Sequence, residues 1–290
     1  MTVPESEFTF LSPNSEPYPK SITAFVVAPE ETGPDTGLIH FAHGWGGNRF
    51  QYREMMHDFA ARYDLVCVGT EYRQSGYDFD PERGLGAYRP YDASHYQVVD
   101  CLLTVREALA RFPVNPTRLF AFGGSQGGHI ALLMAELSPR TFGLTIAGSA
   151  LTYIDPARME WTGRLMSPDE LAIRDAVRMA PRIDCPVVLM HGTADLTVPD
   201  RHTRVMEAAL KRAGKEVVCR YIEGGGHGLE PVTTRHVVTR EMADTYLRTV
   251  QTDGTTVFSR QERVEIPCVS RTCIIDWSRE GRDPELMNWE

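Results

Sequence analysis

The sequence predicts an α/β fold with a mostly parallel central sheet and helices on both faces, and three observations support this. Apolar runs such as "GLIHFAHG" and "PVVLMHG" alternate with stretches whose apolar residues recur at helical spacing. Several of these runs, for example "LVCVGTEY", are rich in β-branched residues, which favour strands. One stretch, "LFAFGGSQGGHIALLMAEL", turns from a strand pattern into a helix pattern through a cluster of glycines.

The expected elements follow the chain in this alternating order. Strands are expected at residues 8–11, 22–29, 37–44, 65–72, 117–123, 142–148, 186–192 and 216–224, with the first two as an antiparallel pair. Helices are expected at residues 49–62, 93–112, 125–137, 200–213 and 233–249. These elements make one domain over residues 1–250.

Two segments depart from the alternation. Residues 150–182 scatter Tyr, Trp and Met side chains among charges, and we expect them to form a short lid. Residues 251–290 form a C-terminal extension with strand patterns at 255–259, 263–269 and 273–277, for which a β-hairpin packed on the domain is the suggested arrangement.

Composition limits the classes of partner. The formal net charge of −9 argues against nucleic acid, because phosphate binding needs a basic face. No apolar run approaches the roughly 18 residues of a membrane span, and the first 20 residues lack the pattern of a secretory signal. The six cysteines show no C-x-x-C spacing, so reduced thiols are expected. The expectation is a cytoplasmic protein with no membrane partner, and a homo-oligomer is left open.

Ser125 stands where the strand expected at 117–123 meets the helix expected at 125–137. The residues "GGSQG" match the pattern G-x-S-x-G, and a preceding strand and a following helix are the context in which that pattern marks a nucleophile. The serine then adopts φ > 0, while Gly123 and Gly127 let the strand and helix approach each other. Its hydroxyl is exposed at the carboxyl edge of the sheet, so Ser125 is the candidate nucleophile.

A serine hydroxyl needs a general base to become a useful nucleophile. "YIEGGGHGLE" supplies His227 in a glycine-rich loop after a strand, and "VVLMHGTADLTVPD" supplies Asp195 after the strand before it. The order Ser125, Asp195, His227 is that of a Ser-Asp-His triad on an α/β sheet. Two other acids compete with Asp195. Asp184 precedes its strand and lies at the wrong edge of the sheet, and Asp200 falls at the expected start of a helix.

The developing oxyanion of acyl transfer needs two backbone N–H donors. One is expected from the residue after the nucleophile, Gln126, and the other from the loop "HGWGGN" after the strand at 37–44. We assign the second donor to Trp45, although the glycines of this loop leave its register open by one residue.

Other candidate residues have simpler explanations. His129 is expected to pack within its helix, and His191 to be buried and hydrogen-bonded. His40 and His43 could begin a metal site, but no further ligands follow at suitable spacing, so no metal and no cofactor are expected. Tyr153, Trp161 and Met166 of the lid could line a substrate pocket, or they could serve only to bury the lid on the domain.

These motifs together resemble the α/β-hydrolase superfamily over about residues 20–250. Within it, "FGGSQGG", "LMHGTADLTVP", "IEGGGHG" and "GTEYRQSGY" are most similar to the catalytic domain of prolyl-oligopeptidase-type serine peptidases and to related acetyl-ester hydrolases. The resemblance implies an α/β-hydrolase fold and acyl transfer through a serine. The peptidases usually carry a propeller domain, whereas here fewer than about 40 residues precede the strand at 37–44.

Two enzymatic functions and one non-catalytic function are compatible with these residues. The main prediction is a serine hydrolase that cleaves carboxylic esters through an acyl-serine intermediate. The first alternative is a peptidase or acyl-peptide hydrolase that acts on short peptides, in which Glu160, Asp169 and Glu170 of the lid could be argued to bind an N-terminal amine. The second alternative is a binding protein that keeps the hydrolase fold without its chemistry. The expected partner is therefore a small-molecule ester or a short peptide.

Overall fold

The computed structural model describes residues 3–13, 20–74, 76, 90–279 and 286–290. Its central sheet has eight strands in the order β1-β2-β4-β3-β5-β6-β7-β8. β2 runs antiparallel to both of its neighbours, β1 and β4, and the neighbouring pairs from β4 to β8 are all parallel. The structure thus has the predicted sheet, with the expected antiparallel pair at its amino-terminal end.

The elements lie close to their predicted positions. The strands of the central sheet are β1 (Glu5–Leu11), β2 (Ser21–Val27), β3 (Gly37–Ala42), β4 (Leu65–Glu71), β5 (Leu119–Gly124), β6 (Leu144–Gly148), β7 (Val187–Gly192) and β8 (Val217–Ile222). The main helices are α1 (Arg53–Tyr63), α2 (His95–Arg111), α3 (Gln126–Leu137), α7 (Arg201–Arg212) and α8 (Arg235–Thr249).

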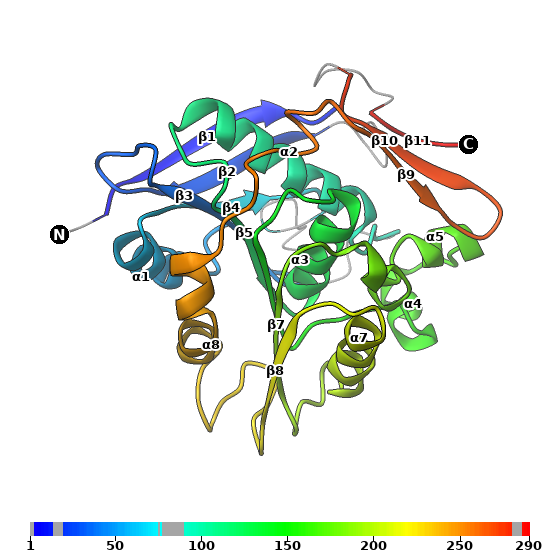
Figure 1. Ribbon diagram of the computed structural model, residues 1–290. Helices are drawn as coiled ribbons and strands as arrows, with labels where there is room; N and C mark the ends of the chain where they lie inside the picture. The colour runs from blue at the N-terminus through cyan, green and yellow to red at the C-terminus, as the bar shows by residue number, and fades with distance from the viewer. Residues whose placement is uncertain (1–2, 14–19, 75, 77–89, 280–285) are drawn as a thin grey trace.

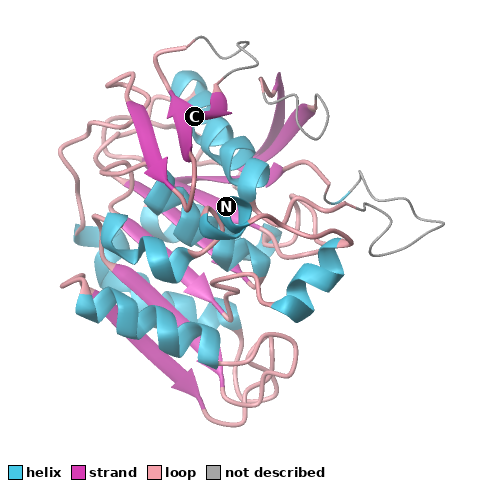
Figure 2. Ribbon diagram, turned by 90° about the vertical axis from the view of Figure 1, so that its right-hand side faces the viewer, coloured by secondary structure: helices cyan, strands magenta, loops and turns pink. Residues whose placement is uncertain are grey.

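Successive residues of a buried strand face opposite layers of helices, as the pleat of a strand requires. Phe120 and Phe122 of β5 belong to the buried cluster formed with α1 and α8, whereas Leu119 and Ala121 belong to the cluster formed with α2, α3 and α7. Figure 1 shows α1 and α8 together on one side of the sheet and α3 and α7 on the other. In Figure 2, helices lie in front of the strands of the central sheet.

The predicted lid segment consists of short helices. They are α4 (Pro156–Thr162), α5 (Pro168–Ala172), α6 (Ala176–Met179) and a 3-10 turn at Ala180–Arg182. α4 contacts the loop after β7, because Arg158 donates to the carbonyl of Thr197 at 2.5 Å and Arg201 donates to Asp155 at 2.9 Å. These bonds join the lid to the loop that carries Asp195.

The C-terminal extension differs in detail from the expected hairpin. β9 (Arg263–Pro267) and β10 (Thr272–Asp276) do pair antiparallel, and β11 (Met287–Trp289) adds a third strand. The strand expected at 255–259 is a turn, because Thr256 and Ser259 exchange bonds in which each backbone N–H donates to the other's hydroxyl. Figure 1 places the small sheet beside α5.

The turn between β9 and β10 is hydrogen-bonded to α5 of the lid segment. The N–H groups of Val269 and Ser270 both donate to the Asp169 carboxylate of α5 at 2.8 Å, and the Ser270 hydroxyl donates at 2.6 Å. The hydroxyl and N–H of Ser270 are the main cause of a pKa of Asp169 well below its usual value. The six cysteines, Cys268 and Cys273 of this sheet included, are free thiols.

No helix in the described ranges combines the length and the apolar character that crossing a bilayer requires.

Candidate active site

Ser125 lies at the sharp turn between β5 and α3. Its backbone has φ +60° and ψ −126°, a conformation that costs a residue with a side chain about 1–3 kcal/mol and is held by its surroundings. The Ser125 N–H donates to the carbonyl of Gly148 at the end of β6 at 2.8 Å, and its own carbonyl accepts from the N–H groups of His129 and Leu151. The residue is thus fixed in a strained position at the carboxyl edge of the sheet.

Glycine is required on both sides of Ser125. A Cβ on Gly123 would collide with the carbonyl of Gly127, and a Cβ on Gly127 would collide with the carbonyl of Ala42 in β3. In both cases the obstacle is backbone, so no side-chain movement relieves it. The glycines therefore permit the close approach of β3, β5 and the start of α3, as the sequence predicts.

Gly123→Ala is expected to destabilise the fold by at least about 3 kcal/mol, because overpacking against backbone cannot be relieved locally. Urea unfolding followed by circular dichroism measures the loss. Gly33→Ala is the matched control, since a Cβ there has nothing within 4 Å. Equal stability of the two variants would contradict this account of the turn.

His227 and Asp195 form a hydrogen-bonded pair at the same edge. His227 follows β8 and Asp195 follows β7, and their Nδ1 and Oδ2 atoms are 2.7 Å apart. This bond turns Nε2 of the imidazole away from the acid. The His227 side chain keeps 29% of its surface exposed, whereas that of Asp195 is fully buried. The acid can therefore orient the ring and stabilise an imidazolium without itself meeting solvent.

Asp195 is held as a carboxylate. Burial would raise its pKa, but hydrogen bonds from His191, His227 and the Val198 N–H outweigh burial and hold the pKa well below its usual value. Its Oδ1 accepts from the N–H groups of Thr197 and Val198 at 2.8 and 3.0 Å. An ionised acid with this many donors keeps one geometry over the neutral pH range.

The two competing acids lie elsewhere. Asp184 pairs with Lys215 and comes before β7, at the amino edge of the sheet. Asp200 begins α7, where it pairs with Arg204 one turn later. Neither contacts His227.

One arginine ties the loop of His227 to the turn of Ser125. Arg235, the first residue of α8, donates to the carbonyl of His227 at 2.7 Å. Its side chain lies against the α-carbons of Gly124 and Gly148, where an added Cβ would meet it within 3 Å. The loop carrying the candidate base is therefore held next to the residue that precedes the candidate nucleophile.

The loop after β3 passes beside Ser125, as the oxyanion assignment requires. A Cβ on Gly44 would stand 3.4 Å from Cβ of Ser125, and Trp45 is the next residue. The Gly44 N–H donates to Oε1 of Gln51, which holds the loop from the other side. Gln126 is the first residue of α3, so its N–H has no acceptor within the helix. Both assigned segments thus border the candidate nucleophile.

An apolar cluster extends from this loop to the lid. The ring of Trp45 stacks on that of Tyr91 at 4.1 Å between centroids, and the ring of Trp161 meets it edge-on at 6.0 Å. Met166 is buried against the same group. Trp161 and Met166 therefore lie with Trp45, but Tyr153 does not, because its ring packs on His202 at 4.4 Å.

The other histidines are engaged within the protein. His129 contacts the Ser94 hydroxyl and the Arg174 carbonyl, and His40 contacts the Thr70 hydroxyl. His43 stacks on Tyr72 at 4.1 Å. Within the described ranges no three His, Cys, Asp or Glu side chains gather as a metal site would require.

Two of the three acidic lid residues suggested for binding an amine have other partners. Asp169 holds the turn between β9 and β10, and Glu170 accepts from Arg164 and from the Ser167 N–H. Glu160 lies exposed on α4. The lid surface next to Trp45 is therefore mainly apolar, and Glu160 is the one of these three acids that stays exposed there.

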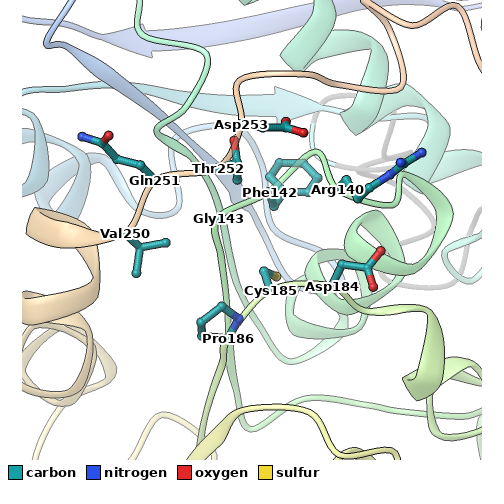
Figure 3. A pocket seen from close by; sticks show the side chains of 10 residues that line it. All are labelled: Arg140, Phe142, Gly143, Asp184, Cys185, Pro186, Val250, Gln251, Thr252 and Asp253. Atoms are coloured by element: carbon teal, nitrogen blue, oxygen red, sulfur yellow. The ribbon is translucent and has the colours of Figure 1, made fainter.

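Two hollows flank the sheet at opposite edges. One, of about 250 Å³, lies before the starts of β6 and β7 and includes Asp184 and Cys185 among its lining residues (Figure 3). The other, of about 430 Å³, lies between the starts of α1 and α8 and includes Tyr52, Gly228 and Arg235. Ligands of open parallel sheets bind at the carboxyl edge. Only the second hollow borders the loop of His227.

Sequence reasoning did not find three residues of this site. His191 has its Nε2 3.2 Å from Oδ2 of Asp195, Arg235 holds the His227 loop, and Tyr91 donates to the side chain of Gln126 at 2.9 Å. Tyr91 contacts Gln126, and Arg235 also lies against Gly124 and Gly148, so both act between segments far apart in the chain. The one signal in the sequence was the position of His191 at the end of a strand, four residues before Asp195.

Comparison with known proteins agrees with this arrangement. The sequence model of the prolyl oligopeptidase family matches residues 90–252, which include all three candidate triad residues. A search of curated protein sequences found no match.

Several solved structures share the fold. The acylaminoacyl peptidase of Pyrococcus horikoshii is 18% identical with a TM-score of 0.71, and the match covers 86% of this chain and 43% of that one. A putative dipeptidyl aminopeptidase IV from Bacteroides ovatus is 15% identical with a TM-score of 0.67, covering 85% and 36%. A puromycin-hydrolyzing peptidase from Mycobacterium tuberculosis is 19% identical with a TM-score of 0.65, covering 83% and 38%.

The chain spans less than half the length of these structures. At identities below 20% the likeness shows the fold, whereas the sequence model matches more than half of the chain. This chain has the α/β-hydrolase fold and belongs to the prolyl oligopeptidase family.

Proposed function

We propose that this protein is a serine peptidase that cleaves short peptides at an amide bond through an acyl-Ser125 intermediate. The observation that carries the proposal is the 2.7 Å bond between Asp195 and His227 at the sheet edge where Ser125 is held at φ +60°. Family membership supports cleavage of an amide better than the ester hydrolysis predicted first. Ester cleavage would use the same three groups and is an outcome of the test below.

The proposed reaction has two halves. His227 takes the proton of the Ser125 hydroxyl while Oγ attacks the scissile carbonyl carbon, and the N–H groups of Trp45 and Gln126 bind the oxyanion. The imidazolium gives that proton to the leaving amine as the C–N bond breaks. A water, deprotonated by His227, then attacks the acyl carbon. The bond from that carbon to Oγ breaks, and the imidazolium returns its proton to Oγ, which regenerates Ser125 and releases the acid. Asp195 stays ionised throughout and stabilises the imidazolium.

We further propose that the part of the substrate on the acyl side of the scissile bond is uncharged and apolar. Trp45 and Trp161 offer apolar surface next to the oxyanion loop, with Met166 buried in the same cluster. Asp169 and Glu170 are occupied by other groups. Among Glu160, Asp169 and Glu170, a free N-terminal ammonium would find only the solvent-exposed carboxylate of Glu160, and an exposed ion pair contributes little. An N-acylated residue with a large apolar side chain would instead bury apolar area.

Three chromogenic substrates test these proposals. We expect kcat/KM for N-acetyl-phenylalanine 4-nitroanilide to exceed that for unblocked phenylalanine 4-nitroanilide by at least about tenfold, the equivalent of about 1.4 kcal/mol. Hydrolysis of 4-nitrophenyl butyrate with no cleavage of either anilide would restore the ester prediction. A preference for the unblocked anilide would refute the apolar acyl side while leaving the peptidase proposal in place.

A further inference from the structure

Tyr91 joins three parts of the candidate site. Its ring stacks on Trp45 of the loop after β3, with centroids 4.1 Å apart and planes 25° apart. Its hydroxyl donates to Oε1 of Gln126, the residue after the candidate nucleophile, at 2.9 Å. Its backbone N–H donates at 2.9 Å to the carbonyl of Thr162 at the end of α4. One buried residue, 2% exposed, thus contacts both segments assigned to the oxyanion hole and also the lid.

The side chain of Gln126 is fixed at both ends. Its Oε1 accepts from Tyr91, and its Nε2 donates to Oε1 of Gln97 at 2.7 Å. Gln97 in turn accepts from the Ser94 N–H and donates to the Arg73 carbonyl. A buried amide with every end bonded has one orientation, and this orientation sets the backbone of the residue that carries it.

The segment that carries Tyr91 is itself held firmly. Asp92 forms a buried ion pair with Arg174, and the Arg174 Nε–H also donates to the carbonyls of Asp92 and Ala93. Gln74 accepts from the Asp92 N–H at 2.6 Å and donates to the Pro90 carbonyl at 2.9 Å. Hydrogen bonds on both sides of Tyr91 therefore fix its backbone, so its side chain can restrain the positions of Trp45 and Gln126.

We propose that Tyr91 is a positioning residue for the oxyanion hole, which keeps the N–H groups of Trp45 and Gln126 aimed at one point. This inference rests on the proposed function. The physical reason is that N–H donors stabilise an oxyanion only when both stand about 2.7–3.1 Å from it, and a donor on a loop loses that alignment unless neighbouring side chains fix it. The stack fixes the Trp45 loop, and the hydroxyl fixes Gln126.

Tyr91→Phe tests the hydroxyl while preserving the ring. We expect kcat on N-acetyl-phenylalanine 4-nitroanilide to fall about tenfold, a fraction of the 10²–10³ lost when one donor is removed outright. KM should stay within twofold, because the oxyanion exists only after attack. The inhibition constant of a trifluoromethyl ketone analogue, whose adduct carries the same oxyanion, should rise by the same factor as kcat falls.

Two further variants separate positioning from general loss of structure. Tyr63→Phe removes a partly buried hydroxyl that donates to Asp244 at 3.0 Å on the opposite layer, and kcat should be unchanged. In Gln126→Met, which removes the acceptor, the added Tyr91→Phe change should cost no further activity.

The outcomes are distinct for the two proposals. Wild-type kcat in Tyr91→Phe, a change in KM alone, or an equal loss in Tyr63→Phe would each overturn the positioning role and leave the peptidase proposal standing. A wild-type protein with no hydrolysis that depends on Ser125 would overturn the proposed function and this inference with it.

Discussion

Replacing Ser125 with alanine is expected to lower kcat by about 10⁶-fold and to leave the fold intact. The hydroxyl is the only group of the site that can form the acyl intermediate, so Asp195 and His227 have no proton to move without it. Stability should change by less than about 1 kcal/mol, because the backbone keeps its bond to Gly148 and alanine is no larger than serine. Anilide hydrolysis and labelling by a fluorophosphonate probe measure the loss, and thermal unfolding checks the fold.

Ser149 provides a matched control for this experiment. It directly follows β6 with φ +47°, and its hydroxyl is buried with no hydrogen-bond partner among the described residues. Ser149→Ala should label and hydrolyse at close to the wild-type rate. If Ser125→Ala still labels, or still turns over substrate at more than a thousandth of the wild-type rate, the nucleophile has been misassigned.

The protein is expected to lose stability steeply as the pH falls from about 6.5 toward 4. Five of the six buried histidines have a pKa that the fold lowers. Burial lowers the pKa of His40 and His129 to about 3 and that of His43 and His202 to about 4, and it lowers the pKa of His95 well below its usual value. In the unfolded chain each would titrate near 6.5.

The direction of the effect follows from these values. Between the folded and unfolded pKa the unfolded chain binds more protons, so acid favours unfolding. The contribution of these histidines to the unfolding free energy is complete above about pH 6.5, and it is lost progressively as the pH falls from there toward the folded values of about 4 and 3. Five protons correspond to at most about 7 kcal/mol per pH unit, which is comparable to the whole stability of many domains. We therefore expect the protein to unfold between about pH 6 and pH 4.5.

Urea midpoints measured from pH 8 to pH 4.5 test this expectation, because the slope of unfolding free energy against pH counts the protons taken up. His129→Gln removes one buried imidazole and should reduce the number of protons taken up on unfolding near pH 5 by about one. A midpoint that does not move between pH 7 and pH 5 would show that these histidines are not the source of acid sensitivity.

The fold was largely predictable because its strands are buried on both faces. Runs such as 65–68 and 186–190 are continuously apolar, and a parallel sheet covered by two helical layers buries them fully. The same logic placed Ser125, Asp195 and His227 at one edge, since each directly follows a strand of one parallel set. The strand pattern at 255–259 misled because side-chain bonds between Thr256 and Ser259 made a turn of it.

Contacts that depend on the direction in which a side chain points could not be predicted from the sequence. The pattern shows that the lid is apolar, but whether Tyr153 faces Trp45 or His202 depends on how the short helices α4 to α6 turn. Tyr91 lies in a stretch without periodicity, so nothing in the sequence indicates that its hydroxyl meets Gln126. These side chains are set by packing between distant segments, which a local pattern does not record.

The hydrogen bonds from the turn at residues 269–271 to the Asp169 carboxylate have a consequence for the order of folding during synthesis. Translation completes the stretch from Ser125 to His227 before it produces that turn, so a growing chain holds every candidate triad residue while its lid lacks this anchor. The turn that anchors α5 is therefore synthesised after the three candidate triad residues, and the lid segment gains this anchor later than the sheet edge gains those residues.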